Sequence, residues 1–121
     1  MTSFNSSRTN TRNTLASKPV ALTPKSTALL EDAGYMVERV EHYNAFVRRK
    51  FDLWGFADLL AIRRDEVLAV QVTSASNHAS RRTKIADSDK VGRVREAGIR
   101  IEVHSWQKKN GRWECRREDL S

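Results

Sequence analysis

Two neighbouring apolar runs decide the fold of this chain, Phe56-Ala-Asp-Leu-Leu-Ala-Ile62 and Val67-Leu-Ala-Val-Gln-Val-Thr73. Both runs are short and rich in branched residues, and the charged stretch Arg63-Arg64-Asp65-Glu66 separates them. This pattern predicts a β-hairpin with a four-residue loop. Each run also carries polar residues, which a buried strand ordinarily lacks.

The register of this hairpin brings the polar residues together. If Ile62 pairs with Val67, Asp58 lies directly opposite Gln71, with Cβ atoms about 5 Å apart on one face of the sheet. Thr73 points the same way as Gln71, because strand side chains alternate with period two. A carboxylate and an amide oxygen so placed suit one hard divalent cation. Without a ligand or hydrogen-bond partner, their burial would cost a few kcal/mol.

Composition narrows the class of protein. The 121 residues, of which 39% are hydrophobic, suffice for one small globular domain, and no apolar run approaches the length of about 20 residues that spans a bilayer. The single cysteine, Cys115, excludes an internal disulfide and a multi-cysteine zinc site, and it fits a reducing cytoplasm. The net charge of +7 favours a polyanionic partner, usually nucleic acid, although a basic surface also serves solubility alone.

The chain divides into an arm and a domain. Residues 1–22 are rich in Ser, Thr, Asn and Arg and lack apolar periodicity, so we expect a disordered basic arm. The folded domain is expected over residues 23–121. It begins with a helix that has Thr23 as N-cap and Pro24 at its first position and that ends at Gly34.

The remaining elements follow from periodicity and turn residues. We expect a strand over 35–41, a polar basic stretch over 42–50, the central hairpin, and a helical region over 74–97 that is broken near 87–89 and restarted by Ser88 as a cap. Residues 99–104 alternate as a strand, and Asn110-Gly111 predicts a tight turn into a return strand over 112–117. A helical crossover between the hairpin and this strand gives an α/β fold, with a mixed sheet flanked by helices.

The central motifs resemble those of the PD-(D/E)xK nuclease superfamily, over roughly residues 24–106. Gly55-Phe-Ala-Asp58 is similar to the family's Gly-x-x-Asp strand, and Gln71-Val-Thr73 stands where the family carries Glu-x-Lys or, in VRR-NUC proteins, Gln-x-Lys. Small phage and bacterial nucleases and archaeal Holliday junction resolvases are the nearest likeness. The resemblance implies a restriction-endonuclease-like core, Mg²⁺ or Mn²⁺ as cofactor, DNA as partner, a homodimer, and a cytoplasmic location in a bacterium or a phage-infected host.

The resemblance also implies a set of site residues. Asp58 and Gln71 would be catalytic metal ligands, joined by the main-chain carbonyl of Val72. Asp52, six residues before Asp58, is a candidate further ligand or a group that contacts a ligand. An acidic residue of the first helix often completes such sites, and Glu31 is the nearest match, with Glu38 a weaker one.

Thr73 departs from the family pattern. The family's lysine orients the nucleophile and balances charge in the transition state, whereas a threonine hydroxyl supplies no positive charge. We expect Lys84, on the helix after the strand, to take over this catalytic role, with Arg81 or Arg82 as alternatives.

A further group of polar and aromatic residues is predicted to contact nucleic acid. These residues lie in the basic stretch before the hairpin, beside Gly55, and at the start of the following helix, where exposed N–H groups favour anions. They are Arg48, Arg49, Lys50, Trp54, Asn77, Arg81 and Arg82.

Three hypotheses remain open from the sequence. The leading one is a metal-dependent, structure-selective DNA endonuclease of the resolvase type. The second is a nucleic-acid-binding protein on the same fold that lost catalysis with the lysine. The third is a basic module that binds another protein, for which weak DNA affinity and weak salt dependence are expected. Each polar residue taken alone also has an ordinary structural explanation, as a hydrogen-bond acceptor at a strand end or part of a solvent-facing edge.

Overall fold

The computed structural model describes residues 21–121, so nearly all of the predicted arm lies outside the described residues. The elements, in chain order, are α1 (Thr23–Asp32), β1 (Met36–Arg39), β2 (His42–Asn44), β3 (Arg49–Phe51), β4 (Leu59–Arg63), β5 (Glu66–Ser74), the 3-10 helix η1 (Ala75–Asn77), α2 (His78–Ala86), α3 (Val91–Glu96), β6 (Arg100–Lys109) and β7 (Arg112–Asp119). None of the helices within residues 21–121 has the length and apolar character needed to cross a bilayer.

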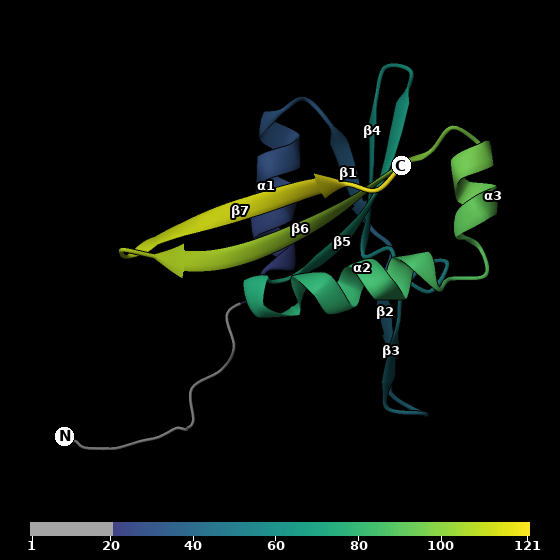
Figure 1. Cartoon of the computed structure of the whole chain (residues 1–121), viewed down its shortest axis with the longest axis horizontal. Coiled ribbons are helices and arrows are strands. Elements are labelled where there is room, and N and C mark those ends of the chain that lie inside the picture. The colour runs from purple at the N-terminus through teal and green to yellow at the C-terminus, as the bar shows by residue number, and fades with distance from the viewer. Residues whose placement is uncertain (1–20) are drawn as a thin grey trace.

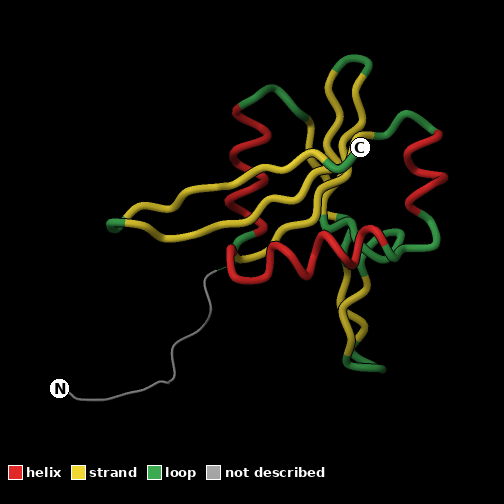
Figure 2. Tube along the Cα trace, viewed as in Figure 1, coloured by secondary structure: helices red, strands yellow, loops and turns green. Residues whose placement is uncertain are grey.

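The main sheet has the strand order β1-β4-β5-β6-β7, and β2 pairs with β3 in a separate two-stranded sheet. β5 and β6 run parallel, whereas every other neighbouring pair in the main sheet is antiparallel. Parallel neighbours require a long crossover, and α2 and α3 supply it. The mixed α/β sheet flanked by helices is therefore confirmed, and Figure 2 shows the helices around it.

Helices cover both faces of this sheet. In Figure 1, α2 lies in front of the sheet and α1 behind it. The α1 side has an apolar cluster formed by Leu30, Tyr35, Leu59, Ala61, Leu68 and Val70. The α2 and α3 side has a second cluster formed by Phe56, Ala57, Ala69, Ile85, Val91, Val94, Ile101 and Val103. Because each fully buried aliphatic side chain contributes about 1.5–3 kcal/mol, these two clusters fix the layers.

The central hairpin has the predicted register but a shorter loop. Ile62 pairs with Val67, as expected. The strands continue to an Arg63–Glu66 pair, whose side chains form an ion pair at 3.2 Å, so only two residues make the turn. The prediction of a four-residue loop is wrong because cross-strand attraction extends pairing into the charged stretch.

Three other expectations need correction. Leu22, not Thr23, is the N-cap of α1, and Lys90, not Ser88, is the N-cap of α3. The Ser88 hydroxyl donates to the Trp54 carbonyl and accepts from the Lys90 N–H. The basic stretch expected over 42–50 contains the β2–β3 hairpin, which leaves the body of the protein in Figure 1.

Candidate metal centre

Asp58, directly before β4, faces Gln71 in the middle of β5. The Gln71 Nε2 amide donates to Asp58 Oδ2 at 2.7 Å, and the Val72 backbone N–H donates to the same oxygen at 2.8 Å. The Asp58 N–H in turn donates to the Val70 carbonyl at 2.8 Å, which holds Asp58 in register. The predicted meeting of this acid and this amide is therefore confirmed, on the face of the sheet that α2 covers.

Two more carboxylates join Asp58. Glu41 lies between β1 and β2, and Asp52 directly follows β3. One carboxylate oxygen from each of Glu41, Asp52 and Asp58 lies within 4.8 Å of the other two. We call these three residues the acidic group. It assembles because β1 and β4 are neighbours, and the segment between them leaves and returns beside Asp58.

The acidic group and Gln71 contain oxygen atoms that the protein does not satisfy. Asp58 and Gln71 are 1% and 2% exposed. Four buried oxygens around them accept no hydrogen bond from residues 21–121: Glu41 Oε2, Asp52 Oδ1, Asp58 Oδ1 and Gln71 Oε1. A buried polar atom without a partner costs about 1–3 kcal/mol, so these four atoms mark a place where a proton, an ordered water or a cation would be stabilised.

Basic side chains border the acidic group. Lys84 Nζ lies 2.6 Å from Asp52 Oδ2, and Lys50 Nζ lies 2.9 Å from Glu41 Oε2. The Lys50 contact compensates part of the negative charge of Glu41. Arg39 pairs with the other oxygen of Glu41 at 2.8 Å. The three cations are far more exposed than the carboxylates, which places them on the solvent side.

The three carboxylates differ in proton affinity. Burial, together with the neighbouring Glu41 carboxylate, raises the pKa of Asp58 to about 8. Burial also acts to raise the pKa of Glu41 and Asp52, but contacts with Asp58 and with Lys50 or Lys84 outweigh it and leave both pKa values below normal. Without a cation, Asp58 therefore holds the proton of the acidic group near neutral pH, as expected when carboxylates crowd together.

The three candidate replacements for the missing lysine point to different places. Lys84 reaches the acidic group through Asp52. The Arg81 Nε lies 3.5 Å from the hydroxyl of Thr73, which is buried. Arg82 pairs instead with Glu118 at 3.2 Å and does not join the group. The sequence prediction that favoured Lys84 agrees with this placement, and its catalytic role stays a prediction.

Glu31 does not lie at the site, so its expected placement needs correction. It is exposed on α1, and α1 packs on the face of the sheet that carries Leu59 and Val70. Asp58 points to the opposite face, because side chains alternate along a strand. Glu38 is exposed on β1 and is likewise outside the acidic group. Glu41 occupies the place that the sequence analysis expected for Glu31.

The remaining predicted residues are divided between the surface and the core. Arg48, Arg49 and Lys50 are exposed on the β2–β3 hairpin. Asn77 is exposed at the end of η1 and donates to the Ser74 hydroxyl at 3.2 Å. Trp54 is half-buried and packs against the apolar cluster under α2 and α3, so its structural role is the one that the contacts support.

Sequence reasoning missed Glu41 and Lys50 as members of this site. Glu41 follows a predicted strand, and nothing in the local pattern separates it from an ordinary exposed glutamate. The only available signal was that Glu41 and Asp52 bracket one polar segment, so a hairpin there would bring them together. Val72 contributes its N–H to Asp58, and a ligand role for its carbonyl stays a prediction.

In comparisons with known proteins, no family model, curated protein or solved structure matches this chain.

Proposed function

We propose that the protein is a metal-dependent phosphodiesterase that cleaves DNA on a restriction-endonuclease-like core. One observation carries the proposal. Four buried oxygens without hydrogen-bond partners belong to the acidic group and to Gln71, around one point of the sheet. An acidic group alone is a common surface feature, but buried acceptors without donors are the atoms that a bound cation would satisfy.

The oxygens fit a hard divalent ion. Carboxylate and amide oxygens are the ligands that Mg²⁺ and Mn²⁺ favour, and Mg²⁺ retains several waters, so a few protein ligands suffice. Asp58 Oδ1, Asp52 Oδ1 and Glu41 Oε2 would hold the ion, with Gln71 Oε1 beside them. A bound divalent ion supplies Lewis acidity toward a phosphate and lowers the pKa of a water nucleophile.

The residues of the chain supply position and positive charge. Gln71 Nε2 and the Val72 N–H hold one Asp58 oxygen, which fixes the carboxylate plane and leaves its other oxygen free. Lys84 is only one-third exposed, and its ammonium group borders the acidic group through Asp52. From there it balances charge that develops on a phosphate, the contribution that Thr73 cannot make.

Topology and charge support the same proposal. Apart from the inserted β2–β3 hairpin, the order is α1, β1, the β4–β5 hairpin, η1, α2, α3, β6 and β7, with β5 and β6 parallel, and this order supports the core that the sequence motifs suggest. The net charge of +7 favours a nucleic acid as the phosphodiester. As two symmetric cuts need two active sites, a structure-selective resolvase would act as a homodimer.

A second candidate is a DNA-binding protein that does not cleave. Two observations favour it: Thr73 replaces the lysine of the motif, and Asp58 is almost completely buried. In this case the acidic group would hold a structural ion or a proton, and only the basic surface would meet DNA.

Cleavage assays separate the two candidates. Four-way junctions, flaps, single strands and linear duplexes are incubated with Mg²⁺, Mn²⁺ or chelator, using wild type, Asp58→Asn and the matched control Asp89→Asn. Asp89 is an exposed acid outside the acidic group. We expect metal-dependent cleavage that falls at least about 100-fold in Asp58→Asn and is unchanged in Asp89→Asn.

Two results would contradict the proposed function. Cleavage by Asp58→Asn at the wild-type rate would show that the acidic group is not the catalytic site. Tight DNA binding without cleavage of any substrate in either metal would establish the second candidate.

A further inference from the structure

The β2–β3 hairpin carries an exposed apolar tip. β2 and β3 form a sheet of their own, with His42 opposite Phe51 at its base, and Figure 1 shows this hairpin leaving the main sheet. Phe46 at the tip is 95% exposed, and Val47 and Tyr43 are also exposed. A large aromatic ring presented to water in this way indicates a surface that meets a partner.

The tip is held in shape although it has no core. The Asn44 Oδ1 accepts hydrogen bonds from the N–H groups of Phe46 at 2.9 Å and Val47 at 3.3 Å. At the base, the His42 and Phe51 rings stack with centroids 5.7 Å apart. An isolated two-stranded hairpin gains little from packing, so these local contacts stabilise the turn that carries Phe46.

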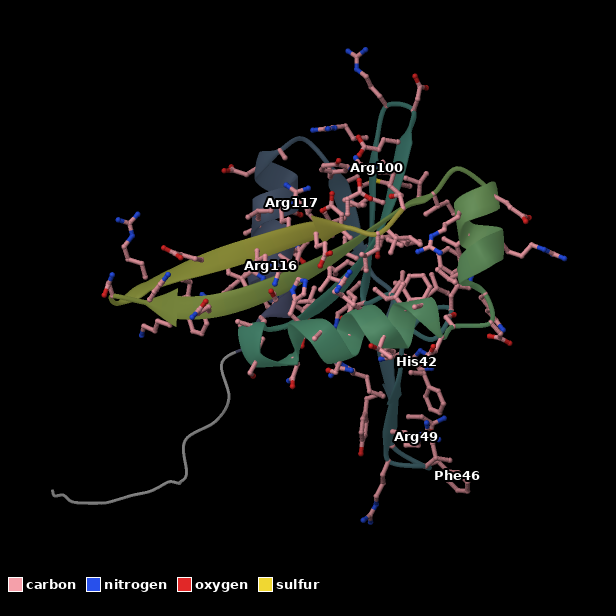
Figure 3. All side chains as sticks on the ribbon, in the orientation of Figure 1. His42, Phe46, Arg49, Arg100, Arg116 and Arg117 are labelled. Carbon is pink, nitrogen blue, oxygen red and sulfur yellow. The ribbon has the colours of Figure 1, made fainter. Side chains whose placement is uncertain are left out.

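The charge of the hairpin selects the class of partner. Residues 42–51 contain three cations, Arg48, Arg49 and Lys50, and no acidic residue. Figure 3 shows Phe46 and Arg49 together near the end of the hairpin, away from the helices. An apolar tip beside several cations is suited to nucleic acid, where cations meet phosphates and the ring meets bases. A second copy of the chain would bring like charges together, which opposes tip-to-tip association.

The hairpin grows directly out of the acidic group. Glu41 is the residue before β2, Asp52 is the residue after β3, and Lys50 on β3 pairs with Glu41. Phe46 is five positions after Glu41, so at about 3.3 Å per residue their Cα atoms lie at most about 17 Å apart. On B-DNA, with 3.4 Å between base pairs, this corresponds to about five base pairs.

We infer that the β2–β3 hairpin is a DNA-recognition finger in which Phe46 inserts at an opened base step of a branched duplex while Arg48 and Arg49 pair with the flanking phosphates. The inference rests on the proposed function, because it places the finger relative to a cleavage site. Inserting an apolar side chain into a closed duplex requires unstacking, whereas a branch point is already open. The finger therefore favours branched over linear DNA.

Binding assays in chelator test the finger without cleavage. The probes are a synthetic four-way junction with 2-aminopurine at the branch point and a linear duplex of equal length. Phe46→Ala is compared with Ile62→Ala, a control that shortens an exposed apolar side chain on β4, away from the hairpin. Thermal unfolding verifies that both variants fold.

Wild type is expected to prefer the junction and to raise the 2-aminopurine fluorescence. Phe46→Ala should weaken junction binding at least about 10-fold, abolish the fluorescence rise, and leave duplex affinity nearly unchanged, whereas Ile62→Ala should resemble wild type. Changing Arg48 and Arg49 to serine together should weaken binding to both probes and reduce the salt slope by about 2, whereas Arg64→Ser at the β4–β5 turn should not.

The outcomes separate failure of the finger from failure of the nuclease proposal. If Phe46→Ala keeps both the junction preference and the fluorescence rise, the inference is wrong, whatever the cleavage assays show. If the wild-type protein never cleaves DNA, and the Phe46→Ala variant loses the junction preference that wild type shows, the inference about the finger is supported and the nuclease proposal fails. If wild type sediments as a dimer and Phe46→Ala as a monomer with unchanged DNA binding, the tip is an interface between copies of the chain, and the inference is overturned.

Discussion

Lys84 Nζ lies 2.6 Å from Asp52 Oδ2, an ion pair that joins α2 to the residue following β3. We predict that Lys84→Met lowers the cleavage rate by about 10²–10³, the usual loss when one group that stabilises transition-state charge is removed. Lys84→Arg should recover part of the rate, because it restores the charge but not the geometry. Single-turnover rates with saturating Mn²⁺ measure the effect. Lys90→Met, at an exposed lysine outside the acidic group, is the control, and equal losses in both variants would remove Lys84 from the mechanism.

A divalent ion should stabilise the fold through the acidic group. An ion that binds only the native state stabilises it by RT ln(1 + [L]/Kd), which is about 2.7 kcal/mol at 100 times Kd. Mn²⁺ should therefore raise the melting temperature of wild type by several degrees and leave Asp58→Asn unchanged. Differential scanning calorimetry with Mn²⁺ and with chelator measures this difference. A similar rise in Asp58→Asn would mean that the ion binds elsewhere.

Asp58 should make the metal-free protein less stable as pH increases. Burial raises its pKa to about 8, whereas the unfolded chain has the normal value of 3.8, so between these values the native state holds a proton that the unfolded state releases. The free energy of unfolding consequently falls from about pH 4 to pH 8. Asp58→Asn lacks this titration, and its stability advantage should grow over that window to a few kcal/mol and then level off. Denaturant unfolding at a series of pH values, in chelator, measures the difference in unfolding free energy between Asp58→Asn and wild type. A difference that shrinks as pH rises would contradict the prediction.

Glu102 should show the opposite pH dependence on the other face of the sheet. It accepts hydrogen bonds from Arg117 and contacts His104 Nε2 at 3.0 Å. Burial acts to raise the pKa of Glu102, but these two partners outweigh it and lower the pKa below normal. A depressed carboxyl pKa stabilises the fold above the unfolded value and loses this effect as pH falls.

We therefore predict that Glu102→Gln destabilises the protein by about 1–3 kcal/mol at pH 7, with a penalty that shrinks below about pH 4.5. Urea unfolding at pH 7 and in acid compares the variant with Glu96→Gln, a control at an exposed glutamate on α3. A penalty that persists unchanged in acid would show that packing, not charge, accounts for the effect.

Local pattern accounted for the centre of the fold. Alternation and branched residues placed β4, β5 and their register, and the position of Asp58 opposite Gln71 followed from that register alone. The Asn110-Gly111 turn was equally predictable, because these residues adopt the positive φ angles of 52° and 76° that a tight hairpin turn needs.

Several features depend on contacts between segments that are distant in sequence, and local sequence pattern could not predict them. The β2–β3 hairpin has no buried face, so hydrophobic periodicity gave no signal for it. Glu41 becomes a member of the acidic group only because this hairpin returns the chain to Asp58. β6 was expected to bury one face, but α1 covers the other, and His104 and Glu102 are buried there with Ser26.

The segment between β1 and β4, which contains the β2–β3 hairpin, leaves the main sheet and rejoins it at one place, because the Val40 N–H donates to the Asp58 carbonyl at 2.9 Å. A segment with both ends anchored so closely is an exchangeable module. Loops of other lengths grafted between Glu41 and Asp52 would leave the five-stranded sheet intact while changing how far the protein extends along a bound molecule. The length of this segment is therefore adjustable independently of the carboxylates of the acidic group.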